Sequence, residues 1–355
     1  MAFEHFLRAG SKKLRCGYTT GTCAALATAG AAELLLTGCK PEKLSLLTPG
    51  GIRVNVEPEE CFMKGDQAVC AVRKDAGDDP DVTDGMLIFA LVEKQSTGIT
   101  LDAGAGIGIV TRPGLDQPVG AAAINSVPRQ MIRAAAETVC EEAEYAGGLH
   151  IVLEVPGGEE LAGKTFNPQL GIEGGISILG TSGIVRPMSE EAIVDTIALE
   201  IRQTAASGER RLILTPGNYG MDFLRAQMPW LGRVKSARCS NYVGEAMDIA
   251  AAEGFGEILL VGHVGKYVKL AGGIMNTHSR MADCRRELFI AHAALCGADA
   301  GLCRRLMEQV TTEGCLDVLE DAGLREPVCL SLLKEIQRVL SRRSPEGMIA
   351  GLLMF

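Results

Sequence analysis

The second half of the chain alternates short apolar runs with helical patterns, and this rhythm constrains the fold more than any other feature. Each run passes through a Gly, Ser or Asn turn towards a helical pattern. Strands that alternate with helices pair in parallel and are covered on both faces. Residues 149–355 are therefore predicted to form a doubly wound, Rossmann-like α/β domain, with a helical tail after Asp299. The apolar runs are residues 176–179, 211–215, 234–239 and 257–261.

A helix is predicted to begin at Ser189, between the first two of these runs. Ile193, Ile197 and Ile201 recur every four residues within it. Side chains at this spacing lie on one face of a helix, so the three isoleucines predict a buried stripe.

The first half of the chain has a different pattern and predicts an α+β domain over residues 1–148. A helix is expected over 22–36 with Thr19 or Thr20 as its N-cap and Gly38 just beyond its end. A second helix is expected over 128–145 with Ser126 as its N-cap. The intervening apolar runs are separated by Gly, Pro and Asp turns, which favours a mixed or antiparallel sheet. These runs are residues 52–56, 68–72, 87–92 and 107–111.

The charge balance limits the partners of the protein. The chain has 44 Asp and Glu against 35 Lys and Arg, a net charge of -9. Such a chain has no broad attraction for nucleic acid or anionic lipid, so we expect neither a nucleic-acid nor a membrane partner. It lacks a run of about 18 apolar residues, and residues 1–15 lack the apolar core of a signal peptide. We therefore expect a cytoplasmic protein.

Neither the cysteines nor the acidic residues are spaced like metal ligands. None of the 12 cysteines forms a C-x-x-C pair, which predicts reduced thiols that act as small apolar fillers. A run of aspartates also lacks the alternation and the terminal Glu of an EF-hand. We interpret it as a solvated, turn-forming loop and predict no metal site. The run consists of Asp75, Asp78, Asp79, Asp81 and Asp84.

Three glycine loops follow apolar runs and predict a small-molecule site. They span residues 180–183, 215–220 and 262–266. Loops at the carboxyl ends of parallel strands share one edge of the sheet, where ligands bind. The candidate cofactor contacts are Gly180, Thr181, Ser182, Gly183, Thr215, Gly217, Asn218 and Gly262.

The helix that follows the first loop indicates the type of ligand. Glu190 and Glu191 fall in its first turn, where they suit the helix dipole but would repel a phosphate. The chain also has no G-x-x-x-x-G-K-[ST] loop. A nucleotide without phosphates fits better, and S-adenosylmethionine is the common one.

A rival motif for the same cofactor lies in the first half. Residues 101–108 read Leu-Asp-Ala-Gly-Ala-Gly-Ile-Gly, the D-x-G-x-G-x-G pattern of many methyltransferases. That pattern requires a helix directly after the glycines. Here β-branched residues and Pro113 follow instead. We interpret the segment from Asp102 to Gly108 as a glycine-rich hairpin or substrate loop.

Histidines and basic residues near the loops are the remaining candidates. His263 and His278 suit proton transfer or substrate contact, although polar structural histidines fit the same positions. On an acidic protein, clustered cations favour a polycarboxylate ligand, with ordinary surface pairing as the alternative. The candidate substrate-binding residues are Arg112, Arg186, Lys266 and Arg280.

Several long segments resemble the CbiD family. They are residues 17–24, 74–83, 174–191, 215–220, 240–245 and 269–280, which occur in family order. The resemblance implies S-adenosylmethionine-dependent methylation of C-1 of cobalt-precorrin-5B, giving cobalt-precorrin-6A in anaerobic cobalamin (vitamin B12) biosynthesis. It places cobalt in the corrinoid substrate only. We also expect substrate contacts in the first domain, a cofactor site in the second, a homo-oligomer, and other enzymes of the pathway as partners.

Two other functions suit the same features. A non-catalytic carrier could hold an unstable corrinoid intermediate, and a phosphate-free nucleotide site could belong to an oxidoreductase. Binding of S-adenosylmethionine, with release of S-adenosylhomocysteine, distinguishes the methyltransferase from both.

Overall fold

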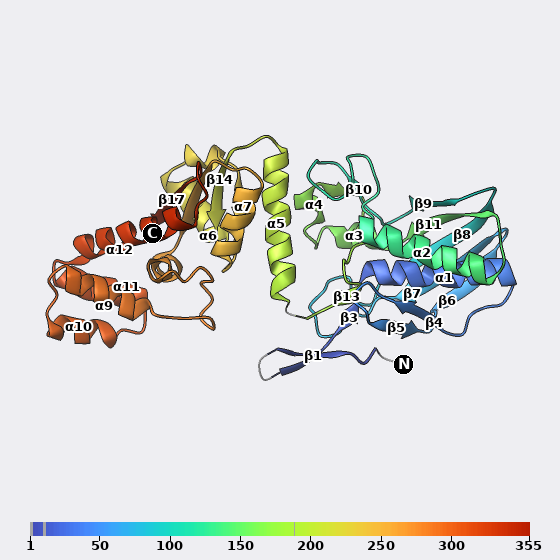
Figure 1. Ribbon diagram of the computed structural model, residues 1–355, viewed down its shortest axis with the longest axis horizontal. Coiled ribbons are helices and arrows are strands. Elements are labelled where there is room, and N and C mark those ends of the chain that lie inside the picture. The colour runs from blue at the N-terminus through green and yellow to red at the C-terminus, as the bar shows by residue number, and fades with distance from the viewer. Residues whose placement is uncertain (1–2, 10–11, 188) are drawn as a thin grey trace. The chain divides into compact units, whose positions relative to one another are not determined.

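The two units of the chain meet between Ser189 and Glu190, later than predicted. The computed structural model (Figure 1) describes residues 3–9, 12–187 and 189–355. Strand β11 (Gly148–Glu154) pairs with β8 (Leu87–Gln95) and β9 (Ile99–Ala103) of the first unit. The predicted boundary near residue 148 is therefore wrong, because the strand that starts there completes the first sheet.

The first unit is a mixed sheet covered on one face by two helices. Its five strands lie in the order β6-β7-β8-β11-β9, and only β11 and β9 are parallel neighbours. Ile88, Ala90 and Val92 of β8 are fully buried in the core that includes both helices. The other elements are β1 (Phe6–Ala9), β2 (Lys12–Arg15), β3 (Gly17–Tyr18), α1 (Thr20–Thr37), β4 (Leu44–Leu47), β5 (Arg53–Val56), β6 (Glu60–Lys64), β7 (Gln67–Arg73), β10 (Ile109–Val110), α2 (Ser126–Glu142), α3 (Gly158–Ala162), α4 (Asn167–Leu170), β12 (Ile172–Glu173) and β13 (Ile184–Val185).

The caps of α1 were correctly predicted. The Thr19 hydroxyl accepts a hydrogen bond from the Thr22 N–H at 3.3 Å, which satisfies one of the free donors at the helix start. Gly38 ends the helix with φ 74°, a left-handed conformation that glycine adopts without a steric cost. The second helix was predicted less well, because α2 begins at Ser126 and its N-cap is Asn125.

The second unit contains a parallel sheet of four strands, β15-β14-β16-β17, as the alternating pattern predicted. Leu212, Leu214 and Leu260 belong to the core that also includes residues of α5, α7 and α12. Ile213 and Val261 alternate with them and pack with residues of α6. Helices therefore lie on both faces of the sheet. The elements are α5 (Glu190–Ala206), β14 (Arg211–Thr215), α6 (Asn218–Gln227), β15 (Ser236–Arg238), α7 (Val243–Ala252), β16 (Glu257–Gly262), α8 (Val264–Tyr267), α9 (Arg285–Leu295), α10 (Ala300–Met307), α11 (Thr312–Asp321), α12 (Arg325–Arg343) and β17 (Ile349–Met354), with short 3-10 helices η1 (Leu231–Arg233) and η2 (Val268–Gly272).

Two details of the second half differ from the prediction. The tail after Asp299 is helical only as far as α12, after which β17 pairs in parallel with β16 along its whole length. The isoleucine stripe of α5 is also shorter than expected. Ile197 and Ile201 are buried, but Ile193 is 42% exposed, because the first turn of α5 extends beyond the core.

Candidate functional site

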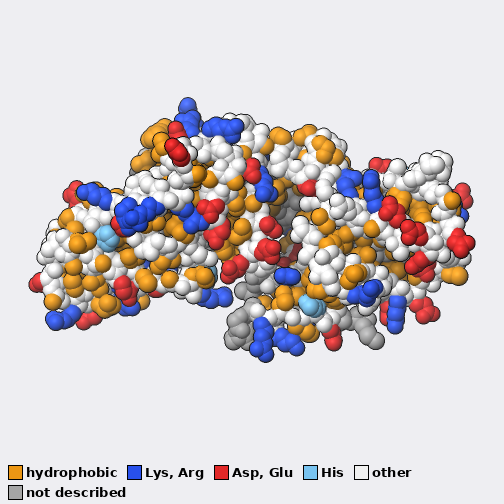
Figure 2. All heavy atoms as spheres, in the orientation of Figure 1, with side chains coloured by type: hydrophobic (Ala, Val, Ile, Leu, Met, Phe, Trp, Pro, Cys, Tyr) orange, Lys and Arg blue, Asp and Glu red, His pale blue; other side chains and the backbone are white. Residues whose placement is uncertain are grey.

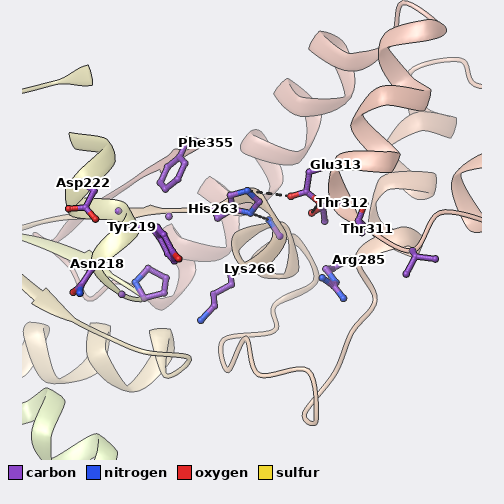
Figure 3. Close-up of a pocket in the computed structure, with 16 residues that line it drawn as sticks. Asn218, Tyr219, Asp222, His263, Lys266, Arg285, Thr311, Thr312, Glu313 and Phe355 are labelled. Atoms are coloured by element: carbon purple, nitrogen blue, oxygen red, sulfur yellow. Dashed lines mark hydrogen bonds and ion pairs between the residues drawn. The ribbon is translucent and has the colours of Figure 1, made fainter. Parts of the chain in front are cut away.

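A pocket of about 830 Å³ lies at the carboxyl ends of β14 and β16 (Figure 3). The chain leaves β14 for β15 on one side and then returns to β16 on the other. Such a switch in strand order opens a crevice at the carboxyl edge of a parallel sheet, where ligands bind. Two of the three predicted loops, residues 216–220 and 262–266, line this pocket together.

Close packing accounts for two of the pocket glycines. A Cβ atom on Gly220 would lie 2.7 Å from the Val261 carbonyl oxygen, and one on Gly262 would lie 2.9 Å from the Tyr267 ring. Gly217 differs, because nothing lies within 4 Å of its added Cβ. Beneath this loop Thr215 is 1% exposed, and its Oγ1 forms no hydrogen bond with any described residue. Thr215, one of the predicted cofactor contacts, is therefore buried next to the loop and does not itself line the pocket.

His263 lies at the start of α8 and contacts both the backbone and an acid. Its Nδ1 accepts a hydrogen bond from the Gly265 N–H at 3.1 Å, and its Nε2 lies 3.4 Å from Glu313 Oε1. The bond at Nδ1 assigns the proton of the neutral ring to Nε2. Neutral His263 is therefore a hydrogen-bond donor towards Glu313, and its basic nitrogen is already occupied.

Lys266 contributes a cation to the same pocket. Its Nζ donates a 2.9 Å hydrogen bond to Asn241 Oδ1, which also accepts one from the Thr277 hydroxyl at 3.2 Å. Asn241 follows Ser240, whose φ of 51° marks a sharp turn after β15. One amide oxygen therefore joins the turn after β15, α8 and the segment that precedes His278.

Aromatic side chains form part of the pocket wall. Phe355 stacks on Phe223 with ring centroids 4.3 Å apart, and the edge of His263 meets Phe355 at 5.9 Å. Tyr219 is 83% exposed and lies among the pocket residues drawn in Figure 3. An exposed ring beside a pocket can stack on a base or face a cation.

The third predicted loop, residues 180–183, lies in the first unit and does not line this pocket. Residues 176–179 form only isolated bridges, Ile107↔Ile176 and Ile124↔Ile178, rather than a strand of the parallel sheet. The prediction that all three loops share one sheet edge is therefore wrong. Met188, within the motif that surrounds this loop, lies outside the described residues.

The structure gives the 180–183 loop a packing role at the start of α1. Thr22 Oγ1 donates to the Gly183 carbonyl at 2.7 Å, and the Leu179 N–H donates to Thr20 Oγ1 at 2.9 Å. Gly180 has φ 126°, and a Cβ there would lie 2.4 Å from the Thr19 side chain. Thr181 is exposed, while Ser182 donates its hydroxyl to the Ile184 carbonyl at 3.1 Å.

Glu190 and Glu191 do not bear on the ligand of this pocket as predicted. Both do lie in the first turn of α5, but this helix does not follow a strand of the parallel sheet. Their charge therefore does not decide which ligand suits the pocket. The pocket has its own acids, Asp222 and Glu313.

The other predicted residues are dispersed. His278 accepts a hydrogen bond at Nδ1 from the Arg280 N–H at 3.0 Å, and neither residue lines the pocket. Arg112 and Arg186 are exposed in the first unit, where Arg112 Nη1 donates to the Gln169 carbonyl at 3.3 Å. Of the four predicted substrate cations, only Lys266 lines the pocket.

The Asp102–Gly108 segment does not form the predicted hairpin, because β9 pairs with β11 and β10 pairs with β12. β9 ends at Ala103, a turn leads to β10, and the next helix begins only at Ser126. Asp102 Oδ2 lies 2.9 Å from His150 Nε2, and the added Cβ of Gly106 would lie 1.9 Å from the Val155 carbonyl oxygen. These glycines serve close backbone packing.

The acidic loop is held by partners within the protein. Asp75 accepts two hydrogen bonds from the Arg15 guanidinium, at 2.5 and 2.8 Å, and Asp81 pairs with buried Lys74 at 2.6 Å. Across residues 3–9, 12–187 and 189–355 no cluster of three His, Cys, Asp or Glu side chains could hold a metal ion. Within the same ranges no helix is long and apolar enough to cross a membrane.

Several pocket residues were missed by sequence reasoning. They come from α6, from the start of α9, from the start of α11 and from the residue after β17, and the last three had no recognised link to the loops. A Thr-Thr-Glu cap pattern at the start of α11 was the available signal, since Thr311 Oγ1 accepts from the Gly314 N–H at 3.0 Å. The missed residues are Tyr219, Asp222, Arg285, Thr311, Thr312, Glu313 and Phe355.

Charges of both signs are interspersed over the face shown in Figure 2. Lys and Arg side chains lie there among Asp and Glu within each unit.

Comparison with known proteins identifies relatives along nearly the whole chain. A protein from Ruminiclostridium cellulolyticum named cobalt-precorrin-5B C(1)-methyltransferase is 48% identical over 341 residues, covering 96% of this chain and 88% of the relative. A protein of the same name from Alkaliphilus metalliredigens is 44% identical over 321 residues, covering 90% and 84%. A crystal structure of the cobalamin biosynthesis protein cbiD from Archaeoglobus fulgidus shares 29% identity, covers 80% of this chain and 87% of that chain, and gives a TM-score of 0.43.

Family models cover both parts of the chain. The CbiD model matches residues 7–187, and the model of the CbiD C-terminal domain matches residues 276–355. The first match alone spans more than half of the chain. The chain therefore belongs to the CbiD family.

Proposed function

We propose that this protein methylates C-1 of cobalt-precorrin-5B, giving cobalt-precorrin-6A in anaerobic cobalamin biosynthesis. The observation that carries the assignment is the identity of 41–48% to relatives named cobalt-precorrin-5B C(1)-methyltransferase, over most of their length. It is a C-methyltransferase that acts on a cobalt corrinoid, and the cobalt belongs to the substrate. The names of these relatives speak against the carrier and oxidoreductase alternatives.

We further propose that the second unit is Rossmann-like and that its pocket takes S-adenosylmethionine as the methyl donor. The open space beside Gly217 and the volume of about 830 Å³ support this fit. The donor carries an adenosine, an ammonium, a carboxylate and a sulfonium. Asn218 and Asp222 suit ribose hydroxyls or the ammonium, Tyr219 suits the base, and Gly262 allows close backbone approach.

The donor supplies an electrophilic methyl group, and the task of the protein is to align it with the acceptor carbon. Holding both reactants in reacting geometry supplies much of the rate. In the first unit, exposed Thr181, Arg112 and Arg186 are our candidates for substrate contact, as is Arg280 in the second. Gly180, Ser182 and Gly183 are proposed to support that surface rather than to bind the donor.

We propose that His263 and His278 position neighbouring groups and that each can also accept a proton. Proton acceptance at Nδ1 of His263 would break its bond to the Gly265 N–H, and His278 is similarly engaged with Arg280. Asn is a good N-cap, so His263→Asn is expected to retain the turn and most of the turnover. Loss of turnover in a folded His263→Asn protein would instead assign a proton transfer to His263.

The function is tested by anaerobic incubation with cobalt-precorrin-5B and methyl-deuterated S-adenosylmethionine. We expect a corrinoid that carries one deuterated methyl group at C-1, together with S-adenosylhomocysteine, as measured by mass spectrometry and NMR. A protein that binds the corrinoid but forms neither product is a carrier. Incubation with an unlabelled donor serves as the isotopic control.

We also propose a cellular location, protein partners and an oligomeric state. Resemblance to a biosynthetic enzyme supports a cytoplasmic location alongside other enzymes of the pathway. Trp230, which is 69% exposed, supplies apolar surface for contacts within a homo-oligomer. Light scattering of the purified protein measures the oligomeric state.

A further inference from the structure

The ionic groups that line the pocket are paired with one another or with close neighbours, with one exception. Glu313 lies 3.4 Å from His263, Asp222 Oδ1 lies 3.2 Å from Arg225 Nη1, and Arg285 Nε lies 2.5 Å from Asp283 Oδ1. Lys266 is the exception, because no acid in the described part of the chain lies within ion-pairing distance of its ammonium.

The surroundings of Lys266 disfavour its charged form when no acid lies nearby. Its side chain is half-buried, and burial lowers the pKa of Lys266 below its ordinary value. Its one hydrogen-bond partner among the described residues is the neutral amide of Asn241. A partly desolvated cation is normally matched by an anion. In Figure 3 the ammonium end points away from the His263–Glu313 pair and from Arg285, towards the lower left of the view.

Asn241 holds Lys266 in place without neutralising it. The amide oxygen accepts one of the three ammonium donors, and two remain for a ligand. The same oxygen is fixed by the Thr277 hydroxyl, and the Thr277 N–H donates to the Asn241 carbonyl at 2.8 Å. An aspartate here would form both side-chain bonds but would cancel the charge. The neutral residue therefore leaves the positive charge available.

We propose that Lys266, positioned by Asn241, is the carboxylate-binding group of the pocket. This inference rests on the proposed function, which provides two sources of a carboxylate. One is the amino-acid end of the methyl donor, and the other is a peripheral carboxylate of the corrinoid. Both would form charge-assisted hydrogen bonds to the free ammonium donors.

Two variants remove the charge in different ways. Lys266→Met deletes the ammonium, while Asn241→Asp retains both hydrogen bonds and pairs the ammonium internally. Thr277→Val breaks the tether without changing any charge, and Lys334→Met removes an exposed lysine of α12 outside the pocket. Thermal unfolding of each variant confirms that the fold is kept.

Two pairs of ligands distinguish the sources of the carboxylate. S-adenosylhomocysteine carries the amino-acid end, and methylthioadenosine lacks it. A stable cobalt corrinoid with free carboxylates is compared with its full methyl ester. We expect Lys266→Met and Asn241→Asp to weaken either S-adenosylhomocysteine or the free-acid corrinoid by about 10- to 100-fold, the loss of one charge-assisted bond, in calorimetric titration. Methylthioadenosine and the corrinoid methyl ester, which lack the carboxylate, should bind to these variants with the same affinity as to the wild type.

The outcomes separate this inference from the proposed function. If the wild type binds these ligands and both charge variants match it, or if Thr277→Val loses as much affinity as Asn241→Asp, the carboxylate assignment is wrong. If the wild type binds neither the nucleosides nor the corrinoids, the proposed function fails and takes this assignment with it. Lys334→Met should bind as the wild type does.

Discussion

Gly180→Ala tests whether the 180–183 loop is a packing element or part of a donor site. Gly180 has φ 126°, a conformation that L-residues rarely adopt, and its added Cβ would lie 2.4 Å from three atoms of Thr19. Thr19 caps α1 and cannot move away without losing its bond to the Thr22 N–H. The substitution therefore strains the backbone and disrupts the start of the helix together.

The expected cost follows from these two effects. An unfavourable positive φ costs about 1–3 kcal/mol, and forcing a methyl group into a filled space costs about 1–3 kcal/mol. We expect a total of about 2–6 kcal/mol in the free energy of local opening. Affinity for S-adenosylhomocysteine should not change, because Gly180 does not line the pocket.

Hydrogen exchange measures this opening without assuming that both units unfold together. The reporters are the Thr19 N–H, which donates to the Gly183 carbonyl at 3.0 Å, and the Gly21 N–H, which donates to the Leu179 carbonyl at 3.1 Å. Their exchange should accelerate strongly in Gly180→Ala, while peptides of the second unit remain unchanged.

Gly217→Ala is the matched variant with the opposite expectation. Its φ of -173° is extended backbone, and nothing lies within 4 Å of the added Cβ, so stability should change by less than about 0.5 kcal/mol. The methyl group enters the proposed donor pocket and should weaken S-adenosylhomocysteine. Our reasoning is refuted if Gly180→Ala weakens the nucleoside more than Gly217→Ala does, or leaves exchange in α1 unaltered.

Three further predictions concern charge and packing. Burial alone would raise the pKa of Asp81, but the ammonium of buried Lys74 lowers it. This ion pair therefore stabilises the fold above about pH 4, and its contribution is lost as the pH falls. Asp81→Asn should lower the free energy of unfolding in urea at pH 7 by about 3 kcal/mol. The hydrogen bonds that His150 donates to the Glu93 and Asp102 carboxylates raise the pKa of His150. Its stabilising charge is therefore present below about pH 6.5 and lost as the pH rises through the folded value. An NMR titration should show a lower pKa of His150 in Glu93→Gln. Ile201→Ala, at a fully buried site in α5, should cost about 2–5 kcal/mol in the same urea assay.

Local signals explain what could be predicted from the sequence. The Thr19 cap and the Gly38 terminator delimit α1 with short-range chemistry, and β14 spans the predicted run, residues 211–215. The loops after β14 and β16 were found for a similar reason, since strand ends with glycines are recognisable where the strands are parallel.

Long-range pairing explains what could not be predicted. The run 176–179 is as apolar as a strand, but Thr20 and neighbouring loops of the first unit take its backbone hydrogen bonds. β17 is separated from its partner β16 by helices α8 to α12, so nothing local indicates that its last neighbour, Phe355, reaches the pocket. The basic residues were predicted as a group, and only the ion pairs of the folded chain show which cation remains unmatched.

The single passage of the chain from one unit to the other has a consequence for how such proteins can evolve. Each unit is one continuous segment, and the residues that line the described pocket fall between 216 and 355. One recombination event at the junction would exchange the whole pocket and leave the α1–loop packing with the other parent. The donor affinity proposed for the second unit and the substrate recognition proposed for the first would then be inherited as separate traits.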